Sequence, residues 1–164
     1  FGGFRPVAAL AAGVLGTTGV ESGEIVKAVA DKIAPRAIIA VDALAARRVE
    51  RLCATVQVCD SGIAPGSGVG NHRFALNAET MGVPVIAVGV PTVVDGATLC
   101  ADLLEEAGQH PDPQAISQAP GATLMVTPRD IDQRVEDMAK VIGYALSLSL
   151  QPALDLESLQ ALIE

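Results

Sequence analysis

The sequence predicts an α/β fold, a three-layer α/β/α domain with a mainly parallel sheet. Two short apolar runs, residues 37–41 and 84–89, are rich in valine and isoleucine and lack polar alternation. Such runs are typical of strands that helices bury on both faces. Stretches with helical patterning alternate with these runs, as in right-handed crossover units. We expect a single domain over residues 1–164.

The composition argues against several classes of protein. The 164 residues include 11 basic and 19 acidic side chains, which give a formal net charge of -8. Nucleic-acid binding is not expected, because neutralising phosphates requires a basic surface. No apolar run approaches the roughly 18 residues of a membrane span, so we expect a soluble, cytoplasmic protein.

Three cysteines, Cys53, Cys59 and Cys100, are widely spaced among apolar residues. This pattern predicts buried, reduced thiols rather than disulfides. His72 and His110 are far apart in the sequence, and no CxxC pair is present. We therefore expect neither a metal site nor another cofactor.

The first predicted strand covers residues 6–11, and a glycine-rich loop follows it. Thr18 and Glu21 have the spacing of a capping box, which satisfies free amide groups at a helix start. A helix is predicted from about residue 20 to residue 34, and Pro35 ends it, because the residue before a proline disfavours helical geometry. Glu21 thus has a structural explanation and is a secondary candidate for site chemistry.

The run over residues 37–41 leads directly into Asp42. This places Asp42 at the carboxyl end of a parallel strand, where open α/β sheets bind ligands and collect reactive groups. The alternative is that Asp42 only caps a helix, predicted over residues 43–52. A further strand is predicted over residues 54–58.

Residues 60–71 form a predicted long loop, because their four glycines and one proline disfavour a regular element. Loops of this length are often functional, so Asp60, Ser67 and Asn71 are candidates to line a cleft. A phosphate-binding loop is not indicated, since both the dinucleotide fingerprint and the P-loop lysine are missing. A connector without a chemical role is the alternative.

The second apolar run, residues 84–89, predicts another core strand, followed by a loop that ends at Asp95. Asp95 is predicted to cap a helix over residues 96–107. Two parallel strands would then bring Asp42 and Asp95 to the same edge of the sheet.

The last third of the chain is predicted to be mostly helical. Residues 108–121 are polar and rich in proline, which indicates a mobile excursion. Thr127 and Pro128 have the pattern of a helix start, and the helix is predicted to end near Leu150. A short helix over residues 154–163 follows.

Five stretches of the sequence carry a resemblance to a known family. They are residues 15–21 (LGTTGVE), 39–45 (IAVDALA), 61–71 (SGIAPGSGVGN), 82–95 (GVPVIAVGVPTVVD) and 124–128 (LMVTP). In order and spacing they resemble the carboxyl-terminal portion of the germination protease of spore-forming bacteria. The resemblance covers about residues 5–150.

This resemblance implies an endopeptidase that degrades small acid-soluble spore proteins during germination, in the cytoplasm of the spore core. It implies a fold similar to the hydrogenase-maturation proteases, within the phosphorylase/hydrolase-like folds. It also implies an atypical aspartic-type mechanism, synthesis as a zymogen and a homotetramer. Asp42 matches one of the family's two proposed catalytic aspartates. The other lies in an amino-terminal segment of the family, so we expect the chain as given to lack it and to be inactive alone.

Other functions remain open from the residues themselves. A small-molecule phosphorylase or transferase would use the glycine-rich loop to bind an anion. A sporulation protein without catalytic activity would keep the fold as a binding module. If a second acid does lie within this chain, Asp60 and Asp95 are the candidates.

Overall fold

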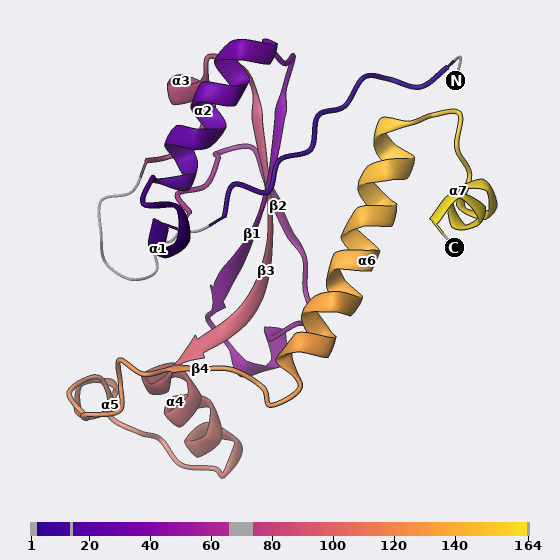
Figure 1. The fold of residues 1–164 in the computed structure, drawn as a ribbon. Coiled ribbons are helices and arrows are strands. Elements are labelled where there is room, and N and C mark those ends of the chain that lie inside the picture. Colours follow the sequence, from indigo (N-terminus) through magenta and orange to yellow (C-terminus); the bar gives the residue numbers. More distant parts are fainter. Residues whose placement is uncertain (1–2, 14, 66–73, 164) are drawn as a thin grey trace. The chain divides into compact units, whose positions relative to one another are not determined.

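The computed structural model describes residues 3–13, 15–65 and 74–163, and Figure 1 shows its helices and strands. The chain packs as two compact units. The smaller unit joins the first ten residues to residues 130–164, and the larger unit comprises residues 11–129. A single domain over the whole chain stays a prediction.

The larger unit contains a mixed sheet of four strands within the described residues. Their order is β1-β3-β2, with β4 also paired to β3. Strand β1 is parallel to β3, whereas β2 and β4 are antiparallel to it. The α/β class is therefore confirmed, but the prediction of a mainly parallel sheet is wrong for the described residues, because β3 has one parallel and two antiparallel neighbours. The strands are β1 (Ile38–Ala46), β2 (Gln57–Cys59), β3 (Val85–Asp95) and β4 (Met125–Val126).

Strand β1 continues four residues beyond Asp42, so the predicted helix over residues 43–52 is wrong. Parallel pairing with β3 holds residues 43–46 extended, and this tertiary pairing outweighs the helical preference of their alanines. Only a 3₁₀ turn, η1 (Val49–Arg51), follows β1 before β2. Asp42 thus lies within a strand rather than at its end.

Strand β3 is also longer than predicted, because it continues through residues 90–95, which were expected to form a loop. Pro91 is tolerated in this strand because the β1–β3 register shifts there, which leaves Thr92 without a partner on β1. The Pro91 carbonyl accepts a 2.7 Å hydrogen bond from the Cys53 amide instead. Val85, Pro91 and Val94 are the largest fully buried side chains among the described residues.

Helix α2 (Ser22–Ile33) packs against one face of the sheet and confirms the helix predicted before Pro35. Gly23 allows α2 to lie close to Phe74, since a Cβ atom at Gly23 would lie 2.6 Å from the Phe74 ring. Met81 of the short helix α3 (Ala78–Met81) joins the same core. The fully buried residues of this core are Ala30, Leu76, Met81 and Val85.

The capping box predicted from Thr18 and Glu21 is wrong. Thr18 ends a short helix, α1 (Leu15–Thr18), and its hydroxyl bonds to the backbone of Val20. Glu21 occupies the N-cap position of α2, but its side chain makes no capping hydrogen bond. Thr18 is the last residue of α1 and not the N-cap of α2, which begins only at Ser22.

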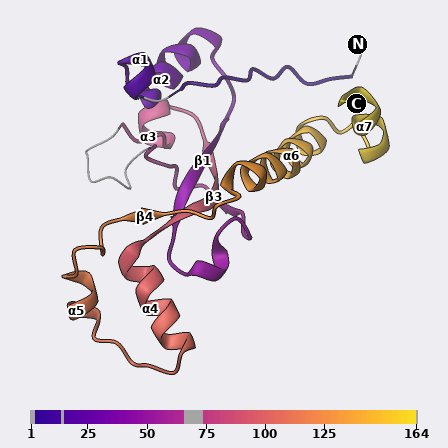
Figure 2. The same ribbon diagram turned by 60° about the horizontal axis from the view of Figure 1, so that its bottom comes forward.

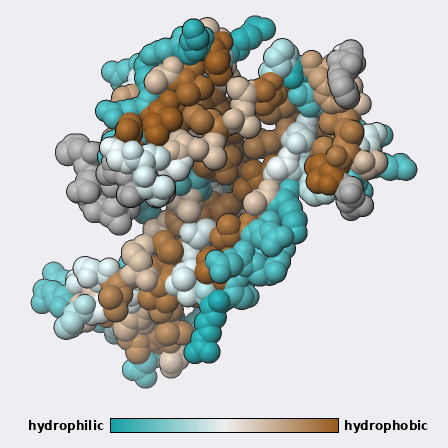
Figure 3. Space-filling view, viewed as in Figure 1, coloured by the Kyte–Doolittle hydropathy of each residue, from teal (hydrophilic) through white to brown (hydrophobic). Residues whose placement is uncertain are grey.

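The apolar runs predicted to be buried on both faces are partly exposed. Val41 of β1 is 51% exposed, and Ile86 of β3 is 38% exposed. The space-filling view shows apolar residues, coloured brown, at the surface over the strands (Figure 3). Among the described residues, no strand pairs with the outer side of β1, which leaves it as an edge strand.

Helix α4 (Gly96–Glu106) follows β3 directly, as predicted. A short helix, α5 (Pro113–Ser117), lies in the segment that was expected to be an irregular excursion. Asp112 caps α5 by accepting a hydrogen bond from the Gln114 amide, and Pro113 occupies its first turn. Helices α4 and α5 lie side by side (Figure 2).

The smaller unit consists of α6 (Ile131–Leu150), α7 (Leu156–Ile163) and the amino-terminal segment. The two helices confirm the predicted elements, although α6 begins four residues later than predicted. Thr127 does not cap α6, because its hydroxyl donates to the Thr92 carbonyl. Both of these residues belong to the larger unit.

The strand predicted over residues 6–11 is absent: this exposed segment pairs with no strand among the described residues. It is held instead by the Gln151 side chain, which exchanges two hydrogen bonds with the Arg5 backbone, of 2.7 and 2.9 Å.

The cysteines are free, but Cys59 and Cys100 are exposed and Cys53 is half-buried, so the prediction of buried thiols is wrong. Cys59 lies on the short strand β2, and Cys100 lies on α4. None of the described helices has both the length and the apolar character needed to span a membrane.

Candidate functional site

Asp42 is the centre of the candidate site. It lies in the middle of β1 and is paired with Gly89 of β3. One of its carboxylate oxygens, Oδ1, accepts a 2.8 Å hydrogen bond from the Ala43 amide. The carboxyl group is half-buried, with an apolar neighbour in Leu44, whose side chain lies over Gly89.

Burial raises the pKa of the Asp42 carboxyl above its ordinary value of 3.8, and the hydrogen bond from Ala43 offsets part of this effect. No charged side chain of the described residues contributes to the shift. A carboxyl group with a raised pKa retains its proton at higher pH than usual, as an acid catalyst requires. Asp42 is therefore a candidate for a proton-donating carboxyl group.

Asp95 does not meet Asp42 and acts as a helix cap. Its carboxylate accepts 2.8 Å hydrogen bonds from the amide and the hydroxyl of Thr98 in the first turn of α4. Burial alone would raise the pKa of Asp95, but these hydrogen bonds outweigh it and lower the pKa. Asp95 lies six residues beyond Gly89 along β3, which corresponds to about 20 Å. The prediction that both carboxylates share one edge of the sheet is wrong, because β1 and β3 extend past Asp42.

Asp60 and Glu21 do not complete the site either. Strand β2 is antiparallel to β3, so the chain that leaves it at Asp60 runs away from Asp95 and past the level of Asp42. Asp60 is exposed. Glu21 precedes α2, and its backbone carbonyl accepts hydrogen bonds from the amides of Glu24 and Ile25. Neither carboxylate contributes to the pKa of Asp42.

Ser67 and Asn71 lie outside the described residues, as does His72. The glycine-rich part of the predicted loop over residues 60–71 therefore adds no described side chain to the candidate site. Within the described part of the chain, no group of three His, Cys, Asp or Glu side chains could hold a metal ion.

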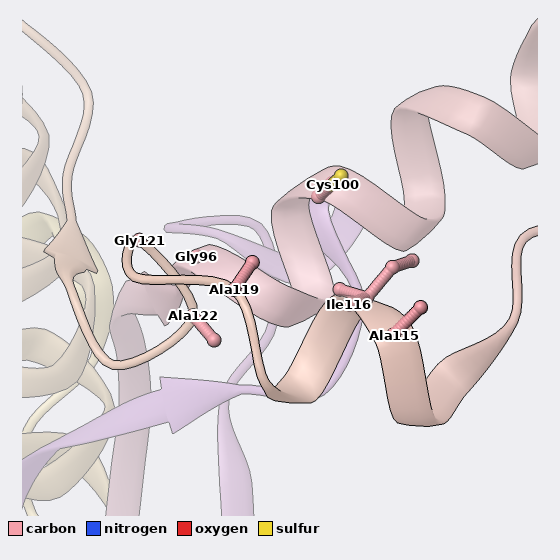
Figure 4. A pocket seen from close by; sticks show the side chains of 7 residues that line it. All are labelled: Gly96, Cys100, Ala115, Ile116, Ala119, Gly121 and Ala122. Carbon is pink, nitrogen blue, oxygen red and sulfur yellow. The ribbon is translucent and has the colours of Figure 1, made fainter.

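A cavity of about 390 Å³ lies between α4 and α5, away from Asp42 (Figure 4). Its lining is almost entirely apolar, and the Cys100 thiol is its one side chain with a polar group. The candidate site is therefore better defined by Asp42 than by this cavity. The lining residues are Gly96, Cys100, Ala115, Ile116, Ala119, Gly121 and Ala122.

Gln57 was not identified from the sequence, although it lies level with Asp42. Both residues pair with Gly89, Asp42 from β1 and Gln57 from β2. The one signal in the sequence was Gly89 itself, since a glycine inside an apolar strand often marks a close approach. The partner strands could not be identified without the sheet order.

Comparison with known proteins identifies the family. The family model described as "Germination protease" matches residues 1–111. The germination protease of Clostridium tetani (strain Massachusetts / E88) is 42% identical over 183 aligned residues, which cover 97% of this chain and 57% of the relative. The germination protease of Clostridium acetobutylicum (strain ATCC 824) is 41% identical over 181 aligned residues, covering 96% and 55%. That of Priestia megaterium (strain ATCC 12872 / QMB1551) is 36% identical over 214 aligned residues, covering 97% and 58%.

The chain spans just over half the length of the curated relatives it matches. Identity near 40% extends over almost all of this chain, including both units. Together with the match of the family model to residues 1–111, this shows that the chain belongs to the germination protease family.

Proposed function

We propose that this chain is part of an endopeptidase that degrades small acid-soluble spore proteins during germination, with Asp42 as one of its catalytic residues. The observation that carries the proposal is the half-buried Asp42 carboxyl with its raised pKa, set in a chain that belongs to the germination protease family. The proposed site of action is the cytoplasm of the spore core. The proposed fold is the three-layer arrangement of the hydrogenase-maturation proteases.

The proposed mechanism is of the aspartic type and uses two carboxyl groups. One must be ionised to activate water, and the other must be protonated to assist the departing amide. Asp42 supplies one group, and its raised pKa suits the protonated member of the pair. The second carboxyl group is proposed to lie outside this chain, in the additional length that the relatives have. Synthesis as a zymogen and assembly as a homotetramer are further parts of the proposal.

The test replaces Asp42 by Asn in the complete gene product. This change keeps the side-chain volume and the acceptor for the Ala43 amide but removes the ionisable group. We expect cleavage of a purified small acid-soluble spore protein to fall by several orders of magnitude, with the fold retained by circular dichroism. Asp60→Asn is the matched control and should cleave normally. Turnover near the normal rate in the Asp42→Asn variant would contradict the catalytic role of Asp42, whereas absence of cleavage by the wild-type protein would favour a binding function without catalysis.

A further inference from the structure

Asp42, Gly89 and Gln57 lie side by side on three adjacent strands. Asp42 of β1 and Gln57 of β2 both pair with Gly89 of β3, which lies between them. Side chains of paired residues project from the same face of a sheet. The side chains of Asp42 and Gln57 therefore flank Gly89 on one face, with their Cα atoms about 10 Å apart, or two strand spacings.

The surface between these two side chains is apolar. Gly89 contributes no side chain, and Leu44 lies over it, since a Cβ atom at Gly89 would be 2.2 Å from Leu44 Cδ1. Asp42 and Gln57 therefore lie on opposite sides of a surface that Leu44 covers. An extended peptide occupies about 5 Å in the plane of a sheet, so its main chain fits over Leu44 between two side chains at this separation.

Gln57 has an unused carboxamide. The residue is exposed, and its side chain makes no hydrogen bond within the described part of the chain. A carboxamide offers both a donor and an acceptor, as a peptide group does, and it does not titrate. It can therefore hold a peptide group through two hydrogen bonds at any working pH.

We propose that Gln57 is a substrate-binding residue, whose carboxamide hydrogen-bonds the main chain of the peptide that Asp42 helps to cleave. This inference rests on the proposed function. Asp42 and Gln57 then hold the peptide from the two sides of Leu44. The carboxyl group of Asp42 faces the reacting amide, and the carboxamide of Gln57 holds the main chain across from it.

The experiment measures steady-state cleavage of an intact small acid-soluble spore protein by the complete gene product. We expect Gln57→Ala to raise KM about tenfold, the effect of losing about 1.4 kcal/mol of binding, with a smaller change in kcat. Gln57→Asn retains the carboxamide on a shorter side chain and should recover part of the affinity. Binding of the same protein to an Asp42→Asn variant, measured by calorimetry, should weaken to the same extent when Gln57→Ala is added.

Val58→Ala is the matched control. Val58 is the next residue on β2, is also exposed and projects from the opposite face of the sheet. Its KM should remain that of the wild type. The inference is overturned if the wild type is active and Asp42→Asn is inactive, yet Gln57→Ala has an unchanged KM or one raised no more than that of Val58→Ala. An inactive wild-type protein would instead overturn the proposed function.

Discussion

Asp42 brings an ionisable group into an apolar part of the sheet, and Leu44 is the neighbour that makes this part apolar. The Leu44 side chain extends across β3 to cover Gly89, which lies level with Asp42. The raised pKa of Asp42 therefore follows from burial, without a second charge.

The pH dependence of stability should reveal the burial of Asp42. The pKa is raised above 3.8 in the folded chain, so the folded state holds the Asp42 proton more tightly than the unfolded state does. The stability from this group is fully present below pH 3.8 and is lost as the pH rises through the folded pKa. We expect Asp42→Asn to be more stable than the wild type at pH 7, with the difference vanishing below pH 3.8, as measured by urea denaturation.

Asp95→Asn provides the control of opposite sign. The pKa of Asp95 is lowered in the folded chain, so its stabilising effect is present above pH 3.8 and is lost as the pH falls through the folded pKa. This variant should be less stable than the wild type at pH 7. An Asp42→Asn variant that loses stability at pH 7, as Asp95→Asn does, would contradict the assignment of Asp42 as a buried carboxyl.

The contact between Leu44 and Gly89 gives a second prediction for single residues. A Cβ atom at Gly89 would lie 2.2 Å from Leu44 Cδ1 and 2.6 Å from Leu44 Cγ. Gly89→Ala should therefore force Leu44 to move and destabilise the protein by about 1–3 kcal/mol. In a Leu44→Ala background the same change should cost much less. A double-mutant cycle by chemical denaturation measures this coupling, and additive effects of the two changes would contradict the contact.

At the scale of elements, α4 is attached to the end of β1 through one buried acid. Asp102 is 8% exposed, and its Oδ2 accepts a 2.7 Å hydrogen bond from the Val49 amide in η1. Arg48 lies 3.5 Å from Asp102 Oδ1 and 3.1 Å from Glu105 on the next turn of α4. The exposed pair with Glu105 contributes less than the buried hydrogen bond, because water screens it.

Asp102→Ala should destabilise the protein by about 1–3 kcal/mol, because it leaves the partly buried Val49 amide without its acceptor. Asp102→Asn should recover most of this loss, since its carboxamide oxygen can accept the same hydrogen bond. Thermal or urea denaturation measures both variants beside Glu105→Ala, which should have a much smaller effect. Equal losses for Asp102→Ala and Glu105→Ala would show that the surface ion pair, and not the buried bond, joins α4 to η1.

The elements that the sequence predicted well are those whose patterns are local. Helix α2 has its apolar stripe and a proline that follows its end, and Asp95 caps α4 as its spacing predicted. The elements predicted wrongly depend on distant partners. Residues 43–46 favour a helix by composition but are extended because they pair with β3. The antiparallel pairing of β2 and β4 also depends on sheet order, which periodicity does not encode.

The candidate site also has residues that a local pattern predicts and residues that depend on distant partners. Asp42 could be predicted, because it follows an apolar run and matches a motif of the family. Its position within β1 could not, since the strand continues only through its pairing with β3. Gln57 and Leu44 reach the site through the register of three strands, which involves residues more than 30 positions apart. Their contribution therefore required the structure.

At the scale of the whole molecule, the question is whether residues 1–164 contain a complete catalytic pair. Among the residues that the structure does not describe (1–2, 14, 66–73 and 164), Glu164 at the end of the sequence is the only acid. No charged side chain of the described residues contributes to the pKa of Asp42. Asp95 is engaged by Thr98, and Asp60 lies beyond the far end of β2. We therefore expect the second carboxyl group of the proposed catalytic pair to come from outside this chain.

We therefore expect a purified protein of residues 1–164 to have no peptidase activity, because a lone Asp42 cannot be both the ionised base and the protonated acid. The assay follows cleavage of a small acid-soluble spore protein by these residues, beside the complete gene product at the same molar concentration. Circular dichroism and light scattering must show that the shorter protein is folded and not aggregated, since its exposed strand β1 favours self-association. Cleavage by residues 1–164 at a rate comparable to the complete protein would show that the second catalytic carboxyl group lies within this chain. Asp60→Asn and Asp95→Asn would then identify that group, because only the variant that removes it would abolish cleavage.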